Sequence, residues 1–135
     1  MQPAVEQPRG LGGRVADRPK GIVVQHIEIA VEGTTVRGRL YRPEGNDPAP
    51  GIAMAPGFTA TSRFTVFESY AAGLADAGIA ALLFDVRGFG YSDGAPRHEV
   101  NPWAQARDYL AAVEALRNTG GVDAERVGVW GVSLS

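Results

Sequence analysis

The sequence of 135 residues contains no cysteine, which excludes a disulfide framework, a thiolate metal site and a cysteine nucleophile. It also lacks long apolar runs, and no window approaches the roughly 20 apolar residues of a membrane-spanning helix. Charge of one sign is not concentrated anywhere, since 13 basic and 15 acidic residues are mixed along the chain. This distribution argues against nucleic acid or an anionic membrane as the main partner.

The N-terminus lacks the apolar core of a secretory signal, so the simplest expectation is a soluble, cytoplasmic protein. Residues 1–20 are rich in Gly, Pro, Arg and Gln and predict a flexible arm. Hydrophobic residues make up 44% of the chain, which is enough for one domain with a core. We place that domain at residues 21–135.

The remaining sequence alternates between strand and helix patterns. Residues 22–31 and 34–41 are rich in β-branched residues and flank Glu32-Gly33, which predicts an antiparallel hairpin. Short apolar runs at 51–55, 79–84 and 127–130 are typical of strands buried on both faces of a parallel sheet. With helices between them, the order β-β-β-α-β-α-β predicts an α/β fold with a mostly parallel sheet.

Two helices are expected, at residues 64–77 and 102–118, with Asn101 as the N-cap of the second and Pro102 in its first turn. A third helix is expected to begin at Ser133. Each of the first two helices carries an apolar stripe at helical spacing. The stripe residues are Phe67, Tyr70, Leu74 and Ala77 in the first helix, and Trp103, Ala106, Leu110, Val113 and Leu116 in the second.

Ser133 is the candidate nucleophile. It lies in Gly131-Val132-Ser133-Leu134-Ser135, directly after the strand at 127–130. The pattern G-x-S-x-G between a strand and a helix is the nucleophile elbow, a tight turn that exposes the serine hydroxyl. Ser135 occupies the fifth position instead of glycine and is also small. The alternative is a glycine-serine turn in which Ser133 caps a helix.

An oxyanion hole needs two N–H groups that converge on the developing negative charge. The backbone N–H of Leu134 is one candidate because it follows the nucleophile. The N–H of Phe58 is the other, since Gly57 lets the preceding backbone come close. The alternative is an ordinary Pro-Gly turn at Pro56-Gly57.

The loop from Asp85 to Gly94 is rich in glycine and polar residues. We interpret Asp85 and Arg87 as residues that hold this loop together through hydrogen bonds and ion pairs, rather than as catalytic groups. Its G-x-G is not a dinucleotide fingerprint, because no helix begins there.

The segments PGF, FDVRGFGYSDG, NPWAQARDYLAAVEAL and VDAERVGVWGVSLS occur in this order. In them the chain resembles the N-terminal half of an α/β-hydrolase, of the dienelactone-hydrolase and acetyl-xylan-esterase type. The resemblance implies an α/β-hydrolase fold that needs neither metal nor organic cofactor. Two positions depart from the family pattern: Pro56 stands where many members have histidine, and Ser135 where the elbow often has glycine.

The resemblance also implies the chain order serine, acid, histidine, so that both partners of the nucleophile follow Ser133. His26 and His98 precede it, and neither is placed as the family's base. We therefore expect residues 21–135 to be incomplete as a domain and inactive alone. The missing C-terminal part of the same protein is then the chief partner, and a homo-oligomer stays open.

The predicted function is that of a serine hydrolase, which cleaves an ester-like small molecule through an acyl-enzyme on Ser133. A lyase, cyclase or acyltransferase on the same scaffold is the alternative within enzymes, and a non-catalytic binding protein is the alternative outside them. Five aromatic residues are candidates for an acyl pocket, although aromatics at helical spacing more often belong to the core. They are Phe58, Phe64, Phe67, Tyr91 and Trp103.

Overall fold

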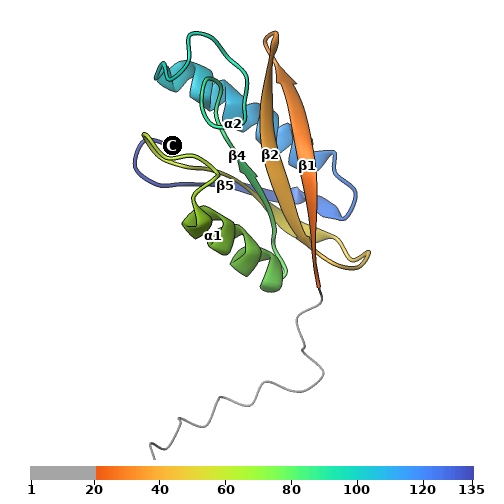
Figure 1. Ribbon diagram of the computed structural model, residues 1–135. Helices are drawn as coiled ribbons and strands as arrows, with labels where there is room; N and C mark the ends of the chain where they lie inside the picture. Colours follow the sequence, from red (N-terminus) through yellow and green to blue (C-terminus); the bar gives the residue numbers. More distant parts are fainter. Residues whose placement is uncertain (1–20) are drawn as a thin grey trace, which may run out of the picture.

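The computed structural model describes residues 21–135 as one five-stranded sheet with a helix on each face (Figure 1). The flexible arm predicted for residues 1–20 lies outside the described residues. The elements in chain order are β1 (Ile22–Val31), β2 (Thr34–Pro43), β3 (Ala49–Ala55), α1 (Thr65–Asp76), β4 (Ala80–Phe84), α2 (Pro102–Arg117) and β5 (Val122–Gly131). This order confirms the predicted succession of strands and helices. No helix is present at Ser133 within the described residues.

The first two strands form the predicted hairpin, with Val31 paired to Thr34. Its turn consists of Glu32 and Gly33, at φ 49° and 78°. Two successive positive φ angles are the signature of the tight turn that matches the twist of hairpin strands. The hairpin extends the sheet through β2, which pairs antiparallel with β4.

The other strands are parallel, and the order across the sheet is β1-β2-β4-β3-β5. All five residues of β4 are buried, because helices cover both faces of this strand. Alternate residues of β4 enter two cores: Leu82 and Phe84 pack with α2, while Leu83 packs with α1. Burying each of these large side chains stabilises the fold by about 1.5–3 kcal/mol.

The apolar stripes predicted for the helices are only partly right: Phe67 and Leu74 of α1 pack against one core, and Val113 and Leu116 of α2 pack against the other. The fully buried residues of α1 are Ala71 and Ala75, whereas Tyr70 is exposed. In α2, Trp103 and Leu110 are 80% and 66% exposed. The residues of α2 that are buried outside the predicted stripe are Ala104, Gln105, Asp108 and Ala112. Alanine lets a helix approach the sheet closely, and Tyr70, Trp103 and Leu110 lie outside these contacts.

The interpretation of the aromatic residues as core is also wrong for most of them. The side chains that are more than half exposed are Phe58, Phe64, Tyr91 and Trp103. Phe67 is half-buried and meets the Trp130 ring edge-on, with 6.4 Å between ring centroids.

The last strand, β5, forms one edge of the sheet in the described part of the chain. Val129 is 63% exposed, so the expectation that this strand is buried on both faces does not hold here. An apolar groove of about 480 Å³ runs between β5 and α2. We call it the α2–β5 groove; its lining includes Tyr109, Leu110, Val113, Val129, Trp130 and Leu134.

No helix in the described range 21–135 is long and apolar enough to cross a membrane. Within the same range, no group of three His, Asp or Glu residues is arranged to hold a metal ion.

Candidate active site

The register of the sheet brings the predicted site residues together. Ala55, the last residue of β3, pairs in parallel with Gly131, the last residue of β5. The segments that follow these two residues therefore leave the sheet side by side. A Cβ atom added to Gly57 would lie 2.6 Å from the Val132 oxygen and 3.3 Å from the Ser133 Cβ. Only glycine fits at this point, because the two backbones are in direct contact.

Ser133 has the strained backbone that the elbow prediction requires. Its φ is 56°, a left-handed conformation that costs a non-glycine residue about 1–3 kcal/mol. The residue is exposed, and its side chain does not pack into either core. The geometry is therefore that of a sharp turn at the carboxyl end of a strand, with an exposed serine in it.

The fifth residue of the predicted elbow, Ser135, folds back over the first. Its Oγ accepts a hydrogen bond of 2.6 Å from the Val132 N–H. The same Oγ lies 2.6 Å from where a Cβ of Gly131 would be. The small residues of the pattern thus make room for this contact, and serine at the fifth position adds a hydrogen bond that glycine would lack.

The two candidate oxyanion residues, Phe58 and Leu134, line one small cavity. Asp85 and Gln105 contribute to its wall. The structure thus brings the residues after β3 and after the candidate nucleophile to one place. Their roles as N–H donors to an oxyanion stay predictions.

Tyr109, in α2, was missed by the sequence analysis. Its hydroxyl accepts a hydrogen bond of 3.1 Å from the Ala55 N–H and donates one of 3.0 Å to the Trp130 carbonyl. Its ring meets Phe84 edge-on at 5.0 Å. Burial raises the pKa of Tyr109, against the hydrogen bonds from Ser135 and Ala55 that lower it. In the sequence, Tyr109 lies next to Leu110 of the predicted apolar stripe, and this position alone is only a weak signal for a role at the site.

Asp85 holds the loops at this end of the sheet, as the sequence indicated. Its buried carboxylate accepts hydrogen bonds of 2.7 Å from both the N–H and the hydroxyl of Ser62, and one of 3.1 Å from the Tyr91 N–H. Gly90 passes so close that its Cβ would lie 2.3 Å from the carboxyl group. Both carboxylate oxygens of Asp85 therefore accept hydrogen bonds from these loops, which gives Asp85 a structural role.

Arg87 has the structural role that its loop position suggested, and its main partner is an acid that the sequence analysis did not identify. Asp108, fully buried in α2, accepts hydrogen bonds of 3.0 and 2.7 Å from the Arg87 side chain and 2.9 Å from its N–H. The hydrogen bond with Asp108 is the main reason that the pKa of Arg87 is raised. This pair fastens the loop after β4 to α2.

The two histidines lie elsewhere. His26 is on an exposed face of β1 opposite Arg39. His98 is exposed in the loop before α2. Its ring centroid lies 5.5 Å from that of Phe89, and its backbone N–H donates a hydrogen bond of 2.9 Å to the Gly88 carbonyl. Neither histidine forms a hydrogen bond with Ser133 in the described part of the chain.

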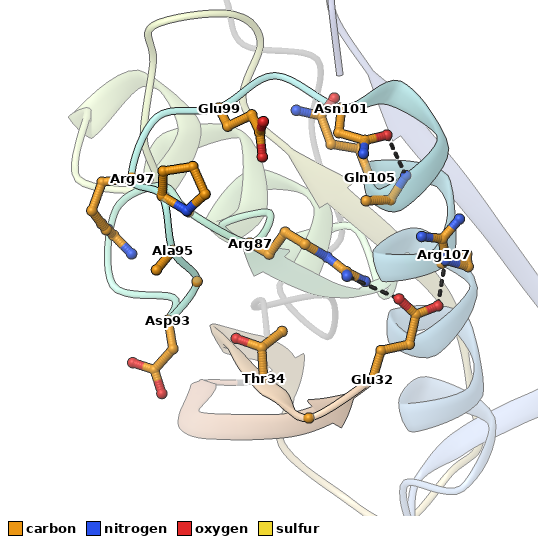
Figure 2. Close-up of a pocket in the computed structure, with 15 residues that line it drawn as sticks. Glu32, Thr34, Arg87, Asp93, Ala95, Arg97, Glu99, Asn101, Gln105 and Arg107 are labelled. Carbon is orange, nitrogen blue, oxygen red and sulfur yellow. Dashed lines mark hydrogen bonds and ion pairs between the residues drawn. The ribbon is translucent and has the colours of Figure 1, made fainter.

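A second, charged pocket of about 680 Å³ lies between the hairpin turn, the loop after β4 and the start of α2 (Figure 2). Glu32 reaches across it to Arg107 and, at 2.9 Å, to Arg87. Hydrogen bonds from these two arginines lower the pKa of Glu32. None of the lining residues comes from 56–58 or 131–135, so this pocket is separate from Ser133.

Comparison with known proteins identifies relatives over most of the chain. The sequence pattern of the X-Pro dipeptidyl-peptidase (S15 family) matches residues 32–135. The thiohydrolase aneE of Aspergillus aculeatus is 45% identical over 108 residues, which are 79% of this chain and 33% of that protein. The acyltransferase drtE of Aspergillus calidoustus is 39% identical over 101 residues, 75% of this chain and 32% of that protein.

The fold comparison agrees. The crystal structure of the α/β hydrolase GrgF from Penicillium sp. sh18 superimposes with a TM-score of 0.75 at 29% identity, covering 82% of this chain and 37% of that one. The resemblance inferred from the sequence motifs, and the partial α/β-hydrolase sheet that it implied, are confirmed. The chain spans about a third of the length of the curated relatives it matches.

Proposed function

Because the chain belongs to the X-Pro dipeptidyl-peptidase (S15) family of α/β hydrolases, we propose that it carries the nucleophile and oxyanion hole of a serine hydrolase. The single observation that carries the proposal is the exposed Ser133 at φ 56°, pressed against Gly57. Strain of this kind in an exposed turn persists where the surrounding structure enforces it, and such sites are often functional.

In the proposed reaction, the Ser133 oxygen attacks the carbonyl carbon of an ester-like substrate. A base outside this sequence takes the hydroxyl proton and passes it to the leaving alcohol or thiol when the carbon–oxygen or carbon–sulfur bond breaks. The N–H groups of Phe58 and Leu134 stabilise the negative oxygen of the tetrahedral intermediate. Water then attacks the acyl-enzyme and releases the acid. No metal or organic cofactor is required by this scheme.

A thioester is the substrate class that we favour within this reaction. The relative of highest identity reported above is called a thiohydrolase, and another is called an acyltransferase. Both names describe transfer of an acyl group, and the two reactions differ in whether water or another nucleophile accepts it. An acyltransferase is therefore the second candidate function, with the same roles for Ser133, Leu134 and Phe58.

We expect a fluorophosphonate to form a covalent adduct on Ser133 in the full-length protein. The hydroxyl is exposed, and the proposed N–H donors would hold the phosphonyl oxygen as they would an oxyanion. Peptide mass spectrometry would locate the adduct, with exposed Ser69 of α1 as the internal control that stays unmodified. A protein that is folded and catalytically active but unlabelled at Ser133 would refute the proposal and favour a binding or non-serine mechanism.

We also propose that the remainder of the same protein covers the α2–β5 groove and supplies the catalytic acid and histidine. The support is an exposed apolar strand edge at Val129 beside exposed Leu110, a combination prone to aggregation. Residues 1–135 produced alone are therefore expected to aggregate and to lack esterase activity, as judged by size-exclusion chromatography and an activated-ester assay. A soluble monomer of this segment that hydrolyses esters would contradict both expectations.

A further inference from the structure

The hydroxyl of Tyr109 sits where the two halves of the proposed oxyanion hole leave the sheet. It bonds the Ala55 N–H at 3.1 Å and the Trp130 carbonyl at 3.0 Å. Ala55 is the last residue of β3, three positions before Phe58, and Trp130 is four positions before Leu134. One side-chain oxygen from a helix thus links the ends of two neighbouring strands, immediately before each contributes a proposed N–H donor.

We propose that Tyr109 is a positioning residue, whose hydroxyl sets the separation between the Phe58 and Leu134 N–H groups. This inference rests on the proposed function, because it assigns a task to Tyr109 only if those two groups bind an oxyanion. Tyr109 itself does not touch the reacting atoms. It acts through the backbone of β3 and β5.

The side chain is held firmly enough for this task. Its ring packs edge-on against Phe84, which is fully buried at the end of β4. Burial raises the pKa of the phenol, so the hydroxyl keeps its proton at neutral pH and can donate to Trp130 while accepting from Ala55. The oxygen is therefore fixed by the core beneath it and by both strands beside it.

The same hydroxyl is close to the elbow. A Cβ on Gly131 would lie 3.6 Å from the Tyr109 oxygen and 2.6 Å from the Ser135 Oγ. Ser135 in turn accepts from the Val132 N–H. The Tyr109 oxygen therefore lies beside the first residue of the turn that carries Ser133. A change in its hydroxyl is transmitted to the elbow backbone through bonded or touching atoms.

The test is Tyr109→Phe in the full-length protein, assayed for kcat and KM with an activated ester or thioester. The substitution keeps the ring and removes the link between the strands. We expect kcat to fall about 10- to 100-fold while KM stays within about twofold, because displacing a donor weakens transition-state binding most. The rate of fluorophosphonate labelling at Ser133 should fall with kcat.

Leu116→Val is the matched control, since Leu116 is buried near the other end of α2, beside Val122. It should lower Tm by a few degrees, about as much as Tyr109→Phe, and leave kcat unchanged. If Ser133 is labelled normally and Tyr109→Phe has the kcat of Leu116→Val, the inference is overturned and the proposed function stands. If wild-type Ser133 is not labelled at all, the proposed function is overturned together with the inference.

Discussion

Replacing Ser133 by alanine in the full-length protein is expected to lower kcat by roughly 10⁶-fold, the size of loss typical when a serine nucleophile is removed. The reason is that no other nucleophile is offered at this turn: the Ser135 hydroxyl accepts from the Val132 N–H beneath it. Substrate binding should change little, because the proposed oxyanion donors are backbone groups. Steady-state kinetics with an activated ester would measure both effects, and Ser69→Ala on the exposed face of α1 is the control.

The Ser133→Gly variant separates the chemical role of this residue from its conformational cost. It should be as inactive as Ser133→Ala and more stable, by about 1 kcal/mol, because glycine adopts a φ of 56° without a Cβ penalty. Thermal unfolding of the two variants would measure this difference. Equal stability would show that the turn is relaxed in solution, and retained activity in either variant would remove Ser133 from the reaction.

The parts of this fold that were predictable are those governed by local rules. The hairpin followed from two β-rich runs around Glu32-Gly33, and that turn does adopt two positive φ angles. The second helix began where a capping residue and proline predicted, with the Asn101 side chain accepting from the Ala104 N–H. The alternation of strands and helices then predicted parallel pairing, which holds for β4, β3 and β5, and the register of this part of the sheet brings the ends of β3 and β5 together.

The parts of the fold that were not predictable are contacts between residues far apart in the sequence, which decide which face of each helix is buried. Apolar spacing correctly chose Leu116 for the core of α2, but it also chose Trp103 and Leu110, which are exposed. It missed the buried Asp108, whose charge is matched by Arg87. A buried acid on a helix has no local signature, since its partner lies 21 residues away. The link made by Tyr109 was missed for the same reason: its two backbone partners are 54 and 21 residues away.

Gly57→Ala is expected to lower kcat about 100-fold or more while leaving the protein folded. The new methyl would lie 2.6 Å from the Val132 oxygen, and because that neighbour is backbone, one of the two segments must move. Either movement displaces the N–H of Phe58 relative to Ser133, and misplacement of about 1 Å or loss of one donor costs roughly 10²-fold or more. Overpacking should also lower stability by about 1–3 kcal/mol.

Gly73→Ala provides the matched control, because it introduces the same methyl group into α1 with no heavy atom within 4 Å. Alanine in an exposed helix should raise stability by about 0.5–1 kcal/mol and leave kcat unchanged. Comparing kcat and Tm for both variants separates the effect of the methyl's contact with Val132 from the general effect of adding a methyl group. If Gly57→Ala kept wild-type kcat, the backbone before Phe58 would not need to approach Ser133 closely. The second N–H donor would then have to come from another segment.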